Sequence, residues 1–166
     1  LNFPKEFFEA QEIEGFLVDA TMKTVWAAEL EVLREIAEIC ERHEITWYAA
    51  YGTLLGAIRH EGFIPWDDDM DIWMKRDDYM RFLQVAPREL PEGYLLHSPL
   101  SELGYLQFHS CVLNAGSVSV EPKRLQNFHG CPFVVGVDIF PLDCLPQDME
   151  AREKEKELFD VISTTA

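Results

Sequence analysis

The sequence is poor in basic residues, with 14 Lys and Arg against 30 Asp and Glu and a net charge of −16 over 166 residues. A basic surface draws proteins to nucleic acids and to anionic membranes, so this composition argues against both as partners. A polyphosphate ligand would also be repelled unless a metal cation or a local basic cluster neutralised its site. Any phosphate chemistry in this chain is therefore expected to need a cation.

The chain also lacks long apolar runs, cysteine pairs and a signal-like N-terminus. No apolar stretch approaches the ~20 residues of a membrane span, so no transmembrane helix is expected. The start at Leu1 has no basic region followed by an apolar one, which argues against a secretory signal and suggests a fragment. The four cysteines form no CxxC pair, which predicts free thiols in a cytoplasmic protein of the bacterial type, in solution or at the inner face of the membrane.

Two His-x-Cys pairs stand out among these cysteines, His109 with Cys111 and His129 with Cys131. Residues two apart in a strand share a face, so each pair directs two potential zinc ligands to one side. A zinc site requires the two pairs to meet in space, and two strands with polar caps explain the pattern more simply.

The composition is that of an ordinary globular protein, with 48% hydrophobic and 27% charged residues. The length predicts a single domain over residues 1–166. Apolar residues at spacings of three and four predict a helix from about Glu12 to Arg42, within an N-terminal helical segment of residues 1–44. Asp19 or Thr21 could mark an internal cap, which would divide this segment into two helices. Its Glu31 is expected on the solvent side. The predicted buried stripe is Trp26, Leu30, Leu33, Ala37 and Cys40.

Helices and strands then alternate. Helices are expected over residues 53–59, 77–86 and 147–161, and strands over residues 46–51, 69–74, 94–97, 105–113, 117–121 and 133–140. This order predicts a mixed α/β or α+β domain with helices packed on a central sheet. The last helix has a thin apolar face and no stop signal, so the domain is expected to be truncated at its C-terminal end.

The acidic run of residues 67–71 is the strongest chemical signal. If this segment is extended, Asp67, Asp69 and Asp71 project to one face, and Asp68 and Met70 to the other. Such like charges repel one another unless a cation lies between them. Carboxylate oxygens combined with substrate phosphates are what Mg²⁺ prefers, so a magnesium or manganese site is expected here.

Two simpler explanations of this acidic run fit the sequence less well. A solvated loop is disfavoured, because apolar residues that favour burial flank the run on both sides. A calcium-binding EF-hand loop is excluded, because Ile72 replaces its glycine and Asp78 replaces its bidentate glutamate.

Two further segments complete a phosphate site. Asp138 lies in an otherwise apolar strand, where it is unlikely to be buried without a partner, and it would add a third acid beside Asp69 and Asp71. Gly52 and Thr53 end one strand and open a helix, whose free N–H groups suit an anion. Arg59 and His60 follow that helix and could reach the same phosphates.

Residues 51–72, with the sequence YGTLLGAIRHEGFIPWDDDMDI, closely resemble the signature of the LicD family, which also includes the fukutin-type enzymes. Residues 137–143, VDIFPLD, resemble its second motif. The resemblance extends from about Glu29 to Pro146 and implies a nucleotidyltransferase fold of the polymerase-β type. It also implies transfer of a phospho-alcohol, typically phosphocholine from CDP-choline, to a carbohydrate acceptor such as lipopolysaccharide, another cell-surface glycan or teichoic acid.

The resemblance assigns roles residue by residue. Gly52 and Thr53 take the place of the phosphate turn, Asp69 and Asp71 that of the paired acids, and Asp138 that of the third acid. Asp67 stays open as an alternative first ligand, because the segment between the turn and the acids is longer than in typical nucleotidyltransferases. Two other functions remain open from the sequence: a sugar-nucleotide glycosyltransferase with Asp69-Met70-Asp71 as its metal motif, and a catalytically inactive binding module.

Overall fold

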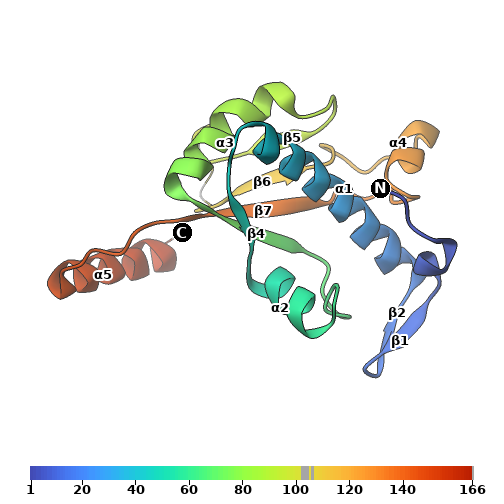
Figure 1. Cartoon of the computed structure of the whole chain (residues 1–166), viewed down its shortest axis with the longest axis horizontal. Helices are drawn as coiled ribbons and strands as arrows, with labels where there is room; N and C mark the ends of the chain where they lie inside the picture. The colour runs from blue at the N-terminus through green and yellow to red at the C-terminus, as the bar shows by residue number, and fades with distance from the viewer. Residues whose placement is uncertain (102–104, 106, 166) are drawn as a thin grey trace.

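A computed structural model describes residues 1–101, 105 and 107–165 of the chain. Its centre is a five-stranded sheet in the order β3-β4-β7-β6-β5 (Figure 1). The strands are β3 (Trp47–Ala49), β4 (Met70–Lys75), β5 (Leu95–His97), β6 (Ser110–Leu113) and β7 (Gly136–Leu142). The pair β4 and β7 is parallel, whereas the other neighbouring pairs are antiparallel. The predicted mixed α/β class is confirmed.

Two helices, α1 (Ala20–Arg42) and α3 (Arg76–Glu89), pack against this sheet and form the core with it. Alternate strand residues such as Ile72 and Ile139 point towards Ile36 of α1 and Phe82 of α3, and all four are fully buried. Burying an aliphatic or aromatic side chain of this size stabilises the fold by about 1.5–3 kcal/mol. The other residues of β4 and β7, which alternate with these, point to the opposite face of the sheet.

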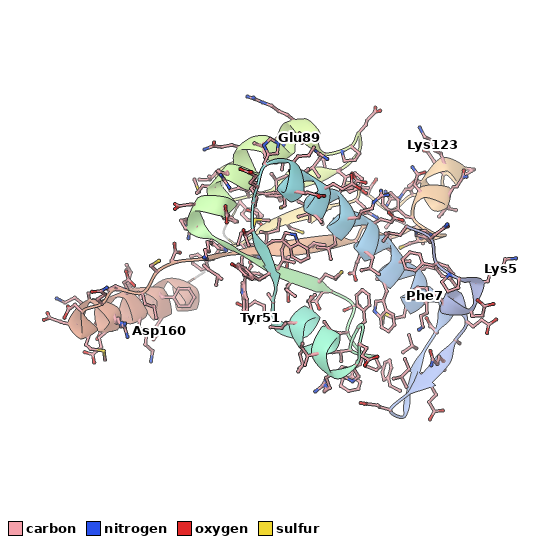
Figure 2. All side chains as sticks on the ribbon, viewed as in Figure 1. Lys5, Phe7, Tyr51, Glu89, Lys123 and Asp160 are labelled. Carbon is pink, nitrogen blue, oxygen red and sulfur yellow. The ribbon has the colours of Figure 1, made fainter. Side chains whose placement is uncertain are left out.

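That opposite face is bordered by α2 (Tyr51–Arg59). Tyr51, labelled in Figure 2, packs its ring edge-on against Trp73 of β4 and Phe140 of β7, with ring centroids 5.1 and 5.2 Å apart. The smaller helices are η1 (Lys5–Phe8) and α4 (Pro122–Asn127), and α5 (Met149–Thr165) projects away from the sheet (Figure 1). Within the described part of the chain, every helix is too short or too polar to cross a lipid bilayer.

The helix predicted from about Glu12 to Arg42 is absent before Asp19, so this part of the prediction was wrong. Residues 11–18 form a hairpin of β1 (Gln11–Ile13) and β2 (Phe16–Val18) rather than the start of a helix. Glu14 and Gly15 connect the strands with positive φ angles of 51° and 80°, the conformation of a tight hairpin turn. The Asp19 side chain then accepts a hydrogen bond from the Met22 N–H at 2.8 Å and caps α1, which therefore begins at Ala20.

The buried stripe of α1 was also misplaced. Trp26 and Cys40 are buried as predicted, but Leu30, Leu33 and Ala37 are only half-buried. The residues that face the sheet are instead Ala28, Val32, Ile36 and Ile39. Glu31, expected on the solvent side, is buried because it forms ion pairs with His129 and Arg34.

Three strand predictions also need correction. Residues 117–121 form no strand, and Pro122 instead opens α4, a helix that no sequence pattern predicted. The strand expected over 105–113 is limited to Ser110–Leu113, and Leu106 of that prediction lies outside the described residues. The last strand begins at Gly136, three residues later than predicted, and continues through Pro141 to Leu142.

Candidate active site

Asp71 on β4 lies directly beside Asp138 on β7, because the parallel strands pair in a register that aligns these two residues. The residues on either side of each acid are buried in the core, so both carboxylates point to the opposite face of the sheet. Each acid is half-buried. The fold thus brings together two predicted site residues that are far apart in the sequence.

The other acids of the run, Asp67 to Asp69, lie in the loop that leads into β4. Two hydrogen bonds hold this loop: the Trp26 indole N–H donates to the carbonyl oxygen of Asp67 at 2.8 Å, and the Asp67 N–H donates to the carbonyl oxygen of Ile64 at 3.0 Å. Because this segment is a loop and not a strand, its side chains do not alternate between two faces as predicted. Asp68, expected to point away, in fact lines the same cavity as Asp69.

Gly52 and Thr53 lie in the first turn of α2, where backbone N–H groups have no partner within the helix. The Thr53 hydroxyl oxygen accepts a hydrogen bond from the backbone N–H of Asp71 at 2.8 Å. A Cβ added at Gly52 would lie 2.4 Å from Oδ2 of Asp67, so this carboxylate rests against the glycine. The turn and the acidic segment therefore form one continuous site.

Crowding of carboxylates raises pKa values in this site. Burial, followed by the charges of Asp69, Asp138 and Asp67, raises the pKa of Asp71 to about 6. Burial and the neighbouring Asp69 likewise raise the pKa of Asp67. A divalent cation would offset this repulsion.

A further acid, Glu29 of α1, belongs to the same group and was missed from the sequence. Its side chain is 2% exposed, and its Oε2 accepts no hydrogen bond from any residue that the structure describes. Burial, followed by the charges of Asp69 and the other acids of the run, raises the pKa of Glu29 to about 9. Its one sequence signal is position, since it shares a helical face with the apolar residues Val32 and Ile36.

Two cavities adjoin these acids, and Asp69 borders both. The larger, of about 670 Å³, lies within the usual size range of ligand pockets. Its lining includes Lys23, Trp26, Gly52, Thr53, Phe63 and Asp67. The smaller cavity, of about 430 Å³, is lined by Glu29, Asp68, Asp138 and Cys111 among others.

The larger cavity is lined by a basic side chain, Lys23, that was not predicted as a site residue. Lys23 is 6% exposed and lies over the rings of Phe7 and Trp26, with its Nζ 5.2 and 5.1 Å from their centroids (Phe7 is labelled in Figure 2). The Trp26 ring is stacked on Phe63 at 4.7 Å. Burial lowers the pKa of Lys23. The cavity therefore combines an aromatic wall, a buried ammonium group and the first turn of α2.

The predicted basic residues are placed differently. His60 lines the larger cavity, and its Nε2 lies 3.3 Å from a Glu14 carboxylate oxygen. Arg59 is exposed, does not line this cavity and donates from Nε to Nδ1 of His60 at 3.3 Å. Arg76 donates two hydrogen bonds to Asp143, at 2.7 and 2.5 Å, and so anchors the end of the second motif.

The two His-x-Cys pairs have separate partners. His109 lies with Nε2 3.3 Å from Oδ2 of Asp138, and Cys111 of β6 is the register partner of Asp138 in β7. His129 instead pairs with Glu31 at 2.7 Å. Among the described residues, no three His, Cys, Asp or Glu side chains are placed to hold one metal ion as they stand. The two pairs therefore do not form the zinc site that the sequence left open.

Comparison with known proteins matches the segment that carries Gly52, Thr53 and the acids of residues 67–71. Residues 44–115 match the family model described as "LicD/FKTN/FKRP, nucleotidyltransferase domain". The chain is 51% identical over 65 residues to the lipopolysaccharide cholinephosphotransferase LicD of Haemophilus influenzae, covering 39% of this chain and 24% of that protein.

Two uncharacterised proteins, from Rickettsia typhi and Rickettsia prowazekii, are 38% and 36% identical over 64 residues, covering 39% of this chain and 21% and 24% of those proteins. The chain thus spans about a quarter of the length of the curated relatives that it matches. Both the family model and the Haemophilus relative match the segment that carries the first signature block, so residues 44–115 are similar to the LicD family.

Proposed function

We propose that this chain carries the donor-binding centre of a metal-dependent phosphotransferase, which transfers phosphocholine from CDP-choline to a cell-surface glycan. The observation that carries this proposal is the alignment of Asp71 with Asp138 beside the Thr53 turn. The name of the Haemophilus relative supports phosphocholine as the group transferred and lipopolysaccharide as the acceptor. Teichoic acid is a second acceptor with the same hydroxyl chemistry.

The fold assignment is part of this proposal. The description of the matching family model supports a nucleotidyltransferase-like fold of the polymerase-β type for the mixed sheet. The assignment of residues 1–166 to one such domain stays a prediction.

The residues fit a hard divalent cation, Mg²⁺ or Mn²⁺, in their chemistry. Asp69, Asp71 and Asp138 offer carboxylate oxygens, Asp67 is a further candidate, and the unpaired Oε2 of Glu29 is an orphaned buried acceptor. Because no three such groups converge among the described residues, binding would require carboxylate side chains to rotate towards one ion. When bound, the cation would neutralise the donor diphosphate and the developing negative charge.

The chain's own residues would supply binding and orientation. The free N–H groups of Gly52 and Thr53 would donate to a donor phosphate, and Lys23 would add the positive charge that a protein of net charge −16 otherwise lacks there. The stacked rings of Trp26 and Phe63 offer a face for the base or the quaternary ammonium of the donor.

In the proposed reaction, an acceptor hydroxyl attacks the phosphorus that bears choline, and the bond from that phosphorus to the oxygen of CMP breaks. Asp138 would orient the hydroxyl and take its proton, while His109, 3.3 Å away, steadies the carboxylate. CMP leaves with the electron pair of the broken bond. Positioning and charge neutralisation would supply most of the catalysis.

A panel of nucleotides tests this proposal directly. With Mg²⁺ present, CDP-choline should raise the melting temperature of the chain more than UDP-glucose or GDP-mannose. Asp71→Asn should abolish the shift, whereas the matched control Asp77→Asn, an exposed acid at the start of α3, should retain it. Preference for a UDP- or GDP-sugar would favour the glycosyltransferase alternative, and no shift with any nucleotide would favour the binding module.

A further inference from the structure

We propose that Glu29 is a further ligand residue of the cation centre, which supplies a carboxylate oxygen from α1 to an ion held by the acids of β4 and β7. This inference rests on the proposed metal-dependent function. It adds to the centre a residue of α1 that lines the smaller cavity and lies outside both signature motifs.

The burial of Glu29 is the first step in the argument. A carboxyl group 2% exposed loses its hydration, which is costly unless hydrogen bonds or ions replace the water. Its Oε2 has no such replacement among the described residues. Leaving a buried acceptor unpaired destabilises the fold, and more so when the group is charged, so an apolar residue at this position would give a more stable core.

The surroundings of Glu29 indicate which ligand would satisfy it. The carboxyl group lines the 430 Å³ cavity together with Asp68, Asp69 and Asp138. Four carboxyl groups around one cavity offer no hydrogen-bond donor to one another when ionised, whereas their oxygens are the ligands that Mg²⁺ and Mn²⁺ accept. Cys111 also lines this cavity, but a thiol is a softer ligand than either of these ions prefers.

Glu31 shows that burial on α1 does not by itself leave an acid unpaired. It lies two residues further along the same helix and is 5% exposed, yet its oxygens contact His129 at 2.7 Å and Arg34 at 3.3 Å. The two acids therefore differ in their partners rather than in their burial. Glu31 ties the helix to neighbouring cations, whereas Glu29 lines a cavity together with other acids.

Calorimetric titration of Mn²⁺ and Mg²⁺ into the purified chain tests the assignment without any activity measurement. Glu29→Gln keeps the shape of the side chain and removes its charge, so it should weaken cation binding by about 10- to 100-fold, the range seen when metal-supporting groups are lost. Glu31→Gln, the matched control on the same helix, should bind both ions as the unmodified chain does. Thermal unfolding of each variant without metal verifies that it is folded.

The outcomes separate this inference from the proposed function. Equal cation affinity in Glu29→Gln and the unmodified chain, or an equal loss in Glu31→Gln, would overturn the role of Glu29. If Glu29→Gln weakens binding but Asp71→Asn does not, Glu29 keeps its role and the proposed centre at Asp71 fails. No binding by the unmodified chain would overturn both. Should Glu29→Gln not fold, Glu29→Asp, whose carboxylate is one methylene shorter, should show the same loss of affinity.

Discussion

The backbone N–H of Asp71 donates a hydrogen bond to the hydroxyl oxygen of Thr53 across 2.8 Å. This contact joins the first turn of α2 to β4 and so sets the distance between the predicted phosphate turn and the predicted metal ligands. A hydroxyl that accepts one hydrogen bond still has its own proton to donate, so Thr53 remains available to a phosphate oxygen.

Removal of this hydroxyl should destabilise the fold. Thr53→Val leaves the partly buried N–H of Asp71 without a partner, which should lower the free energy of unfolding by about 1–3 kcal/mol in urea denaturation. Thr53→Ser keeps the oxygen and should lose less than half of that amount. Equal losses in the two variants would show that the methyl group, and not the hydrogen bond, holds the turn.

Replacement by alanine should lower the stability of the fold at one glycine of α2 but not at another. A Cβ at Gly56 would lie 2.5 Å from the backbone oxygen of Gly62, so Gly56→Ala should destabilise the fold by about 1–3 kcal/mol. A Cβ at Gly52 meets only the flexible end of Asp67 at that range, so Gly52→Ala should fold normally but displace this carboxylate. Urea unfolding measures both, and a stability loss in Gly52→Ala as large as that in Gly56→Ala would contradict this account.

The acids should make the metal-free chain less stable as pH rises. A carboxyl group whose pKa is raised on folding binds protons more tightly in the native state, so its contribution to stability is complete below the unfolded pKa and is lost as pH rises through the folded pKa. For Asp71 that loss ends near pH 6, and for Glu29 near pH 9. In a chelator, the melting temperature should therefore fall between about pH 6 and 9.

Glu29→Gln should flatten this fall, because it removes the one group in the site whose pKa is raised to about 9. Ionisable groups away from the site are the same in both proteins, so their effect on the melting temperature cancels in the comparison. Identical melting curves for the two proteins across this pH range would contradict the raised pKa of Glu29.

Lys23 should contribute to donor binding through its charge. Lys23→Met keeps an unbranched side chain over Phe7 and Trp26 but removes the ammonium group, so CDP-choline affinity in Mg²⁺ should fall about tenfold or more, as for loss of a charged hydrogen bond. Lys75→Met makes the same charge change at an exposed position and serves as the control. The role of Lys23 fails if calorimetry gives both variants the same affinity.

Part of this site was accessible from the sequence because it follows period-two alternation. In β4, apolar Met70 and Ile72 face the core, which directs Asp71 to the other side, and the same pattern directs Asp138 outwards in β7. The parallel pairing that sets these two acids side by side is a property of the sheet order, which no local pattern specifies.

Glu29 and Lys23 could not be predicted as site residues from the sequence, for a different physical reason. Their surroundings depend on how α1 crosses the sheet, and the broad apolar surface of this helix allowed a stripe through Leu30 and Leu33 as readily as the observed face. The hairpin of residues 11–18 was missed because its short strands fit a helical spacing equally well, and Gly15 alone marked the turn.

A double-mutant cycle on Asp71 and Asp138 tests the central claim most directly. Mn²⁺ affinity is measured by calorimetry for the unmodified chain, Asp71→Asn, Asp138→Asn and the double variant. If both acids hold one ion, each single variant should lose most of the affinity, and the double variant should lose little more, with a coupling energy of about 0.5–3 kcal/mol. Losses that add independently, or cation binding that survives in the double variant, would contradict a shared centre.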